Sequence, residues 1–276
     1  MVPVSEKPPV CSRLPRSRAA FTVVELMVVV AIILLVAAVL LPAMSKALEI
    51  ARIVSCGANL RAQGIAWGCY LADNDQTFPV YYLNMPWCYG GRQPALCENP
   101  PGAEQSTPMA DYRPLNPYLQ LPWQKVNKAE YFHCPSDHGI QADHPQSSTH
   151  GRTCYDWFGN SYVANPLVMM KIDNPVTFDA PSHAVLENGR WNWYFYPFQS
   201  TMATIPTEQV IVAGDSQWMY IADGIIVARA AFHNDTNRVN LVFLDGHVVY
   251  TQMQFGVSVT PDYSEQPFPV APTSGP

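Results

Sequence analysis

An uninterrupted apolar segment near the amino terminus most constrains how this chain of 276 residues can fold. Residues 26–45 are 20 consecutive uncharged, mostly aliphatic residues, and a helix that spans a bilayer needs about 20. Glu25 lies directly before them, and an acid within hydrocarbon is costly and usually marks a function. We therefore expect a transmembrane helix in which Glu25 has a specific role.

The flanking charges predict the orientation of this helix. The charged residues that precede Glu25 are Glu6, Lys7, Arg13, Arg16 and Arg18, so the first 20 residues carry a net charge of +3. The positive-inside rule places the amino terminus in the cytoplasm and the chain after residue 45 outside it. A secretory signal peptide also begins with basic residues, but its apolar region usually has only about 7–15 residues. An ordinary anchor helix remains an alternative.

The stretch AFTVVELMVVVAIILLVAAVLLPAM, residues 20–44, resembles the amino terminus of type IV prepilins and type II secretion pseudopilins. In that family a prepilin peptidase cuts before the Phe and methylates the new amino group. The resemblance implies cleavage between Ala20 and Phe21, although the family prefers Gly where this chain has Ala20. Pro42 matches a proline that kinks the helix in many of these proteins.

The resemblance also implies a role for Glu25. Cleavage creates a cationic amine at Phe21, and a carboxylate one helical turn away can cancel a charge that is costly to bury. In the family, the acid of an incoming subunit meets the amine of the previous one. Glu25 is then an assembly residue in a non-enzymatic inner-membrane subunit, whose partners are the peptidase, the membrane and other pilin-like subunits.

The chain after the membrane predicts an α+β fold. Small or apolar residues recur at helical spacing at Ile50, Ile53, Val54, Gly57, Leu60, Gly64, Trp67 and Leu71. A helix from Phe21 to about Asp73 would be roughly 80 Å long, and its outer half must bury this stripe against an antiparallel sheet. The expected divisions are a leader at 1–20, a membrane helix at 21–45, its continuation at 46–75, a β-rich head at 76–258 and an extended, mobile Pro-rich tail at 259–276.

Five segments of the head are strand candidates. Residues 239–246 and 247–253 form a predicted hairpin around the turn signal Asp245-Gly246. The other candidates are residues 208–216, 218–223 and 224–232.

Short elements in the head resemble those of large pilin-like proteins from some environmental bacteria. They are Cys134-Pro135-Ser136-Asp137, the segment from Ser161 to Asn165, and a His that precedes an Asp-Gly pair. The family separates that His and Asp by nine residues, whereas His233 and Asp245 here are separated by eleven. We attribute the difference to a longer turn at 234–238.

Six cysteines follow the leader, and an even number in an exported domain is typical of disulfides. They are Cys56, Cys69, Cys88, Cys97, Cys134 and Cys154, while Cys11 leaves with the leader. Cys56 and Cys69 lie about 20 Å apart along one helix, too far to be joined. Each must pair with a loop cysteine or remain a thiol, and Cys88 with Cys97 is our expected pair.

Two side-chain sets suggest metal or hydrolase chemistry as an alternative. The first set is His133, Cys134, Asp137 and His138, and the second is Asp215, His233, Asp245 and His247. A contact between His233 and Asp245 that closes the hairpin explains part of the second set equally well. We therefore expect no resident metal and no catalytic residues.

Calcium is the one cofactor that the loops make possible, through Asp73, Asn74 and Asp75 or through residues 233–237. If the aromatic-rich stretch NGRWNWYFYPF, residues 188–198, forms a strand, Trp191, Trp193 and Phe195 lie on one face and Tyr194 and Tyr196 on the other. Such a face could stack on carbohydrate, although core packing is the simpler interpretation. A net charge of −6 argues against a nucleic-acid partner.

The sequence suggests three functions, of which we predict the first and keep the other two as alternatives. The first is a pilin-like or pseudopilin-like subunit of a type IV pilus or type II secretion pseudopilus. The second is a membrane-anchored protein whose head binds polysaccharide or another envelope ligand. The third is a membrane-tethered hydrolase that uses His233 and Asp245.

Overall fold

The computed structural model describes residues 22–79, 86–92, 113–122, 128–140, 149, 151–169, 185–187, 190–192, 200, 203–225 and 232–266. The chain divides into two compact units, Met1–Ala47 and Leu48–Pro276, and each is described by itself.

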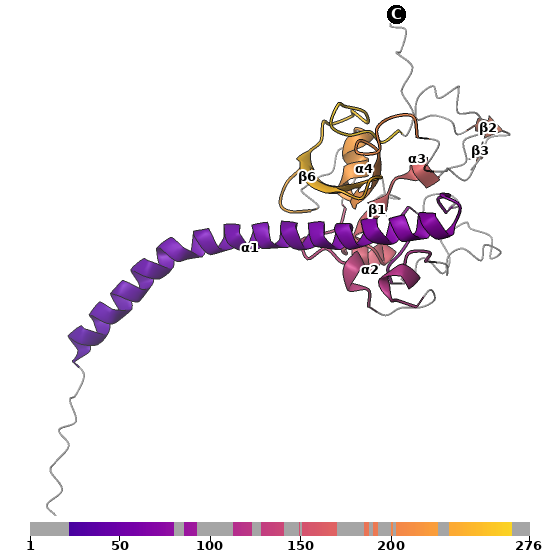
Figure 1. Cartoon of the computed structure of the whole chain (residues 1–276). Helices are drawn as coiled ribbons and strands as arrows, with labels where there is room; N and C mark the ends of the chain where they lie inside the picture. Colours follow the sequence, from indigo (N-terminus) through magenta and orange to yellow (C-terminus); the bar gives the residue numbers. More distant parts are fainter. Residues whose placement is uncertain are drawn as a thin grey trace, which may run out of the picture. The chain divides into compact units, whose positions relative to one another are not determined.

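Helix α1 spans Val23–Asp73, close to the predicted bounds (Figure 1). It ends where Asp75 and Gln76 adopt positive φ angles of 51° and 58°, while the Gln76 N–H donates to the Leu71 carbonyl (2.8 Å). Left-handed residues that follow a helix commonly satisfy its last carbonyls in this way.

In the second unit, α1 buries one stripe of side chains against the head. The buried residues of α1 are Cys56, Leu60, Gln63, Gly64, Ala66, Trp67, Tyr70 and Leu71. They follow the spacing of three and four residues that defines one helix face. The predicted stripe is wrong at its start, because Ile50 and Val54 are 61% and 65% exposed.

A four-stranded antiparallel sheet forms the centre of the head. Its strands are β1 (Tyr162–Ala164), β4 (Ile211–Asp215), β5 (Arg238–Phe243) and β6 (Val248–Gln252), in the order β1-β4-β5-β6. The predicted hairpin over β5 and β6, the predicted strand at β4 and the α+β class are confirmed. A second, two-stranded antiparallel sheet contains β2 (Val185–Glu187) and β3 (Arg190–Asn192).

The hairpin closes through a three-residue loop, and not through the predicted two-residue turn. The Phe243 N–H donates to the His247 carbonyl (3.0 Å) and the Gly246 N–H to the Phe243 carbonyl (2.8 Å). Gly246 has a φ of 86°. A turn followed by a left-handed glycine is the usual geometry of three-residue hairpins.

The main sheet lies between α1 and a short helix. A Cβ on Gly64 of α1 would meet Val242 of β5 at 2.8 Å, whereas a Cβ on Gly214 would meet Leu241 and Trp218. Because Leu241 and Val242 point to opposite faces, α1 covers one face and helix α4 (Gln217–Ala222) lies against the other. The prediction of a strand at 218–223 is therefore wrong.

Four short helices complete the described head. They are η3 (Pro117–Leu119), η4 (Glu130–Phe132), α2 (Cys154–Phe158) and α3 (Pro166–Met169). Helix α2 begins at a cap in which the Thr153 hydroxyl accepts from the Asp156 N–H (2.9 Å) and ends at the left-handed Gly159. Both are common helix boundaries.

The first part of the predicted tail belongs to the head. The Ile211 N–H donates to the Ser264 carbonyl (2.9 Å), and the Ser264 N–H to the Gln209 carbonyl (2.6 Å). The side chains of Tyr263 and Glu265 are buried. Residues 259–266 are thus not an extended tail, and residues 267–276 lie outside the described residues. The predicted strand at 224–232 also lies largely outside them.

Candidate functional site

A capping box between Thr22 and Glu25 closes the amino-terminal end of α1. The Thr22 hydroxyl accepts from the Glu25 N–H (3.2 Å), and Glu25 Oε2 accepts from the Thr22 N–H (2.9 Å). This reciprocal pair satisfies two backbone donors that the helix itself leaves unpaired. Glu25 therefore also has a structural role in its own helix, with Thr22 as its partner. Ala20 and Phe21 lie outside the described residues, so the predicted cut remains a prediction.

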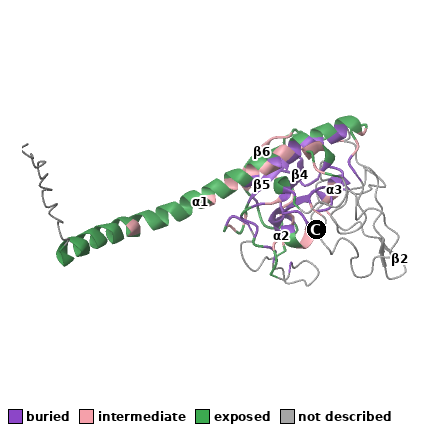
Figure 2. Ribbon diagram, turned by 90° about the horizontal axis from the view of Figure 1, so that it is seen from below, coloured by how far each residue is buried: buried purple, intermediate pink, exposed green. Residues whose placement is uncertain are grey.

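The apolar part of α1 is exposed on all sides in the first unit. Its large apolar side chains from Val23 to Met44 are 45–72% exposed, and Figure 2 shows this stretch almost wholly as exposed surface. Pro42 lies within it. Among the described residues, α1 is the one helix long and apolar enough to cross a membrane. A single such helix near the amino terminus is consistent with a single-pass inner-membrane anchor.

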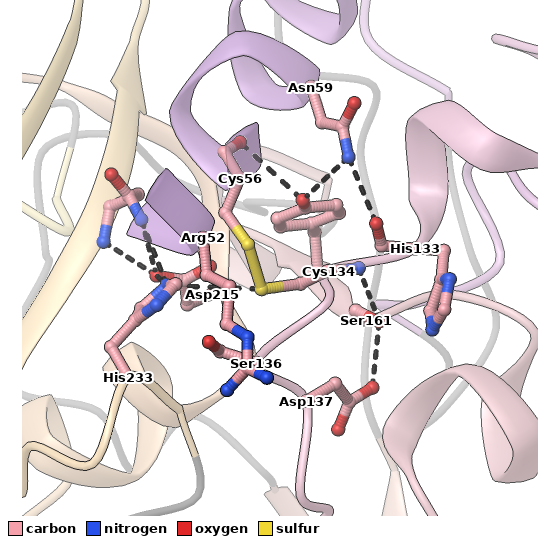
Figure 3. Close-up of a disulfide and its surroundings, with 12 residues drawn as sticks. Arg52, Cys56, Asn59, His133, Cys134, Ser136, Asp137, Ser161, Asp215 and His233 are labelled. Atoms are coloured by element: carbon pink, nitrogen blue, oxygen red, sulfur yellow. Dashed lines mark hydrogen bonds and ion pairs between the residues drawn. A yellow bond between two sulfur atoms is a disulfide. The ribbon is translucent and has the colours of Figure 1, made fainter. Parts of the chain in front are cut away.

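In the second unit, a disulfide joins α1 to the loop that contains Cys134-Pro135-Ser136-Asp137. Cys56 on α1 is bonded to Cys134, with Cα atoms 5.2 Å apart (Figure 3). Arg52 lies one helical turn before Cys56. Glu49 lies two turns before Cys56 and accepts a hydrogen bond from the Ser136 hydroxyl (3.0 Å). The bond agrees with the prediction that Cys56 pairs with a loop cysteine or remains a thiol.

Asp137 organises this loop from the inside. Its carboxylate accepts hydrogen bonds from the N–H groups of Gly139, Cys154 and Tyr155 (each 2.9 Å) and from the Ser161 hydroxyl (2.7 Å). Burial raises the pKa of Asp137, while the four donors act in the opposite direction. The acid of this signature element is therefore a structural acceptor that fixes two chain segments.

The Ser161–Asn165 element supports the same loop and the sheet. The Ser161 hydroxyl accepts from the Cys134 N–H (3.0 Å) as it donates to Asp137. The Tyr162 hydroxyl accepts from the Asn59 amide (3.3 Å) and donates to the Cys56 carbonyl (3.4 Å). The Asn165 amide donates to the carbonyls of Ile211 and Glu265. These side chains hold together segments that are distant in sequence.

A row of polar side chains crosses the sheet beneath α1, one from each strand. Its members are Tyr162, Asp215, Asn240 and Tyr250. Asn240 donates to Asp215 Oδ2 from both its backbone N–H (2.7 Å) and its side-chain amide (3.1 Å). Asp215 and Asn240 are buried, and a buried carboxylate requires donors of this kind.

His233 lies beside Asp215 of this polar row and close to the disulfide (Figure 3). Its Nε2 is 3.2 Å from Asp215 Oδ2 and 3.8 Å from Cys134 Sγ, and its Nδ1 is 3.5 Å from Glu49 Oε1. His233 itself has a positive φ of 53°, a conformation that is uncommon for residues other than glycine. We call Cys56, Cys134, Asp215 and His233 the disulfide–histidine cluster.

The predicted contact between His233 and Asp245 is wrong. Asp245 Oδ1 instead contacts His247 Nδ1 at 2.6 Å and accepts from the His247 N–H (3.0 Å). This contact lies within the hairpin loop, whereas His233 faces Asp215. The second metal-ligand set therefore separates into two pairs, and the hydrolase hypothesis loses its proposed pair of residues.

The first metal-ligand set is also not assembled. Cys134 is bonded to Cys56, the Asp137 carboxylate faces four donors, and the His133 ring packs against Tyr155 with centroids 4.5 Å apart. Among the described residues, one group of three or more His, Cys, Asp or Glu could hold a metal, and it is the disulfide–histidine cluster.

The two loops proposed for calcium are occupied by local contacts. Asp73 Oδ2 accepts from the Tyr118 hydroxyl (3.1 Å), and Asp235 Oδ1 accepts from the N–H groups of Asn237 and Arg238. Calcium binding stays a prediction. The aromatic run at 191–196 offers no test of ligand stacking, because its side chains lie outside the described residues.

The remaining cysteines differ in their surroundings. Cys69 is exposed and Cys154 is buried, and neither forms a disulfide in the described part of the chain. Burial, with the nearby charge of Asp137, raises the pKa of the Cys154 thiol. Cys88 is buried, but Cys97 lies outside the described residues, so the Cys88–Cys97 bridge stays a prediction.

Sequence reasoning missed Glu49 and Asn240 as members of this site. Glu49 does not belong to the predicted apolar stripe of the helix, and a charged residue outside such a stripe needs no partner. Asn240 is the one amide within the apolar strand RVNLVF, and a buried polar residue in such a strand could have indicated a hydrogen-bonded role.

Residues 15–41 match the family model of the prokaryotic N-terminal methylation motif. Searches of curated proteins and of solved structures found no match. The motif covers the end of the predicted leader, the predicted cut, Glu25 and most of the apolar run. In this segment the chain is type IV prepilin-like or pseudopilin-like.

Proposed function

We propose that the chain is a structural pilin-like or pseudopilin-like subunit that is cleaved before Phe21, N-methylated and assembled through α1. The observation that carries this proposal is the methylation motif over residues 15–41. It implies a prepilin peptidase and other pilin-like subunits as partners. Such subunits are usually not enzymes, and the head would lie outside the cytoplasmic membrane.

The exposed apolar surface of α1 supports assembly through this helix. Side chains on every face of residues 23–44 are exposed, and in water this surface would be strongly unfavourable. Lipid covers it before assembly, and helices of neighbouring subunits would cover it in a filament. The proposal holds equally for a type IV pilus and a type II secretion pseudopilus.

The first test is mass spectrometry of the amino terminus of the protein from native membranes. We expect a chain that begins at N-methylated Phe21. A chain that retains residues 1–20 would overturn the proposal, because the subunit could not offer its amine to Glu25 of the next one.

Two variants separate the charge of Glu25 from its capping function. Glu25→Gln keeps an acceptor for the Thr22 N–H, and Gln is common in capping boxes, but it removes the charge. Thr22→Ala removes the other half of the box and leaves the charge. If Glu25 pairs with the neighbouring amine, Glu25→Gln abolishes assembly into sheared filaments or cross-linked pseudopili and Thr22→Ala does not. If Thr22→Ala abolishes assembly and Glu25→Gln does not, assembly requires the helix cap and not the charge of Glu25.

A further inference from the structure

The disulfide–histidine cluster brings four metal-ligating groups together inside the head. One ligand atom from each of Cys56, Cys134, Asp215 and His233 lies within 4.8 Å of all the others. All four residues are 0–3% exposed. They come from α1, from the loop after η4, from the end of β4 and from the segment before β5, so the fold itself assembles the cluster.

The distances approach those of a tetrahedral zinc site. With zinc–sulfur bonds of about 2.3 Å and zinc–nitrogen or zinc–oxygen bonds of about 2.0 Å, neighbouring ligand atoms are about 3.3–3.8 Å apart. His233 Nε2 is 3.2 Å from Asp215 Oδ2 and 3.8 Å from Cys134 Sγ. His233 Nε2 is thus already close to the spacing that a tetrahedral ion requires from two of its partners, and the other ligand atoms lie within 4.8 Å of one another.

The surroundings orient these ligands. His233 Nδ1 faces Glu49 Oε1 at 3.5 Å, and a carboxylate behind a ligating imidazole directs the other ring nitrogen at the metal. Asn240 donates twice to Asp215 Oδ2. Asp215 Oδ1 is buried without a hydrogen-bond partner among the described residues. An unpaired buried carboxylate oxygen is costly, and coordination of a cation would satisfy it.

The bond between the two sulfurs closes this site in the structure. We propose that in the dithiol state Cys56, Cys134, His233 and Asp215 bind one Zn²⁺ ion, so that thiol–disulfide exchange controls a metal site. A dithiol reductant transfers two electrons and two protons to the disulfide and itself becomes a disulfide. Zinc then displaces the two thiol protons, and the sulfurs separate to bind the ion.

Zinc is the ion that this ligand set suits. Two thiolates and an imidazole favour a borderline-soft ion in tetrahedral geometry, whereas calcium and magnesium prefer oxygen ligands. The two thiolates and the Asp215 carboxylate together carry three negative charges, and a divalent cation offsets most of them in a buried position. The inference concerns the head alone and does not require filament assembly.

The test compares the oxidised and reduced forms of the same protein. The untagged full chain in detergent micelles, with Cys69→Ser to remove the exposed thiol, is reduced with dithiothreitol, desalted without oxygen and titrated with Zn²⁺. We expect the reduced protein to retain one equivalent of zinc and the oxidised protein to retain none. Co²⁺ in place of zinc should give a thiolate-to-cobalt charge-transfer band. Absence of stoichiometric binding to reduced protein that retains native circular dichroism would overturn the proposal.

Matched histidine variants show whether the ion lies in this cluster. His233→Gln should weaken zinc binding by about 100-fold or more, since it removes a direct ligand, and Glu49→Gln by about 10- to 100-fold. The control is His133→Gln. His133 is next to Cys134 in the chain, but its ring packs on Tyr155, so this variant should bind zinc as the parent does. If His233→Gln does not fold, the zinc affinity of Glu49→Gln, a change at a partly exposed position, decides whether the ion lies in this cluster. Equal affinity in Glu49→Gln and His133→Gln would place the zinc elsewhere and overturn the proposal.

Discussion

Single buried acids determine much of the head, and Asp137 is the clearest example. Its carboxylate is the shared acceptor for the turn after Cys134, the start of α2 and the beginning of β1. The sequence alone suggested a metal ligand here, because a Cys and an Asp flanked by two His residues are compatible with that chemistry. The three N–H donors that face Asp137 belong to the backbone, and backbone donors cannot be recognised from residue types.

Asp137→Ala should therefore destabilise the head strongly. It leaves three buried N–H groups without an acceptor, and each unsatisfied group costs about 1–3 kcal/mol, so we expect a loss of at least about 3 kcal/mol in the free energy of unfolding. Urea unfolding of the full chain in micelles, followed by tryptophan fluorescence, measures it. Asp156→Ala is the control, since its pair with Arg92 is half exposed and such pairs contribute at most about 1 kcal/mol. Equal losses in the two variants would contradict this role of Asp137.

Glu265 should make the stability of the head depend on pH. Burial, with a contribution from the charge of Asp223, raises the pKa of Glu265 from 4.5 to about 8. Between these values the folded chain holds a proton that the unfolded chain has lost. The stabilisation is therefore fully present below about pH 4.5 and decreases as the pH rises to about 8, with a slope of at most about 1.4 kcal/mol per pH unit.

Glu265→Gln should remove this slope and raise stability most near pH 8. Unfolding free energies of wild type and variant between about pH 5 and about pH 8 give the difference curve, in which other titrating groups cancel. Glu208→Gln, at an exposed position, should leave the slope unchanged. A difference curve that is flat across this range would show that Glu265 titrates normally in the folded head.

At the scale of elements, α1 combines two surfaces with different requirements. Its first part is apolar on all faces, and its second part buries one stripe and exposes the rest (Figure 2). Two glycines one turn apart show how closely the second part of α1 packs on the sheet. A Cβ on Gly64 would lie 2.8 Å from Val242 Cγ2, whereas a Cβ on Gly68 would have nothing within 4 Å.

Alanine at these two positions should have opposite effects on stability. Gly68→Ala should stabilise the head by about 0.5–1 kcal/mol, because alanine restricts the unfolded chain and favours helix. Gly64→Ala should destabilise it by about 1–3 kcal/mol, since the β-branched Val242 cannot turn away easily and the helix must move from the sheet. Urea unfolding of both variants is the measurement. Stabilisation by both would contradict close packing of α1 on β5.

The elements that could be predicted from the sequence are those with a strong local signal. The long helix and the β5–β6 hairpin have clear periodicity and turn residues, and both are confirmed. The apolar run at 218–223 has no such signal, because a short apolar run is equally compatible with a strand and a buried helix. There the structure forms α4, and Trp218 donates to the Val163 carbonyl (3.1 Å), a contact that only the folded sheet provides.

At the scale of the whole molecule, what could not be predicted is which distant segments meet. Asp215 and His233 were grouped from the sequence and do lie together, but Asp245 was grouped with them and does not. Spacing along the chain cannot distinguish these cases, since the pairing depends on the order of strands in the sheet. The same holds for Cys56, whose partner could be restricted to a loop cysteine but not identified among several.

The Cys56–Cys134 disulfide should supply a large part of the stability of the head. It joins residues 78 positions apart, and the cross-link restricts the unfolded chain, so its loss should cost about 2–5 kcal/mol. The double variant Cys56→Ala with Cys134→Ala, compared with wild type by urea unfolding under oxidising conditions, measures this loss. Cys69→Ala is the matched control, because Cys69 is exposed and outside any disulfide of the described residues, and it should change stability by less than about 0.5 kcal/mol. If the double variant were as stable as the control, packing and the polar row alone would hold α1 on the head. In that case, opening of the disulfide would leave the ligands of the proposed zinc site in place.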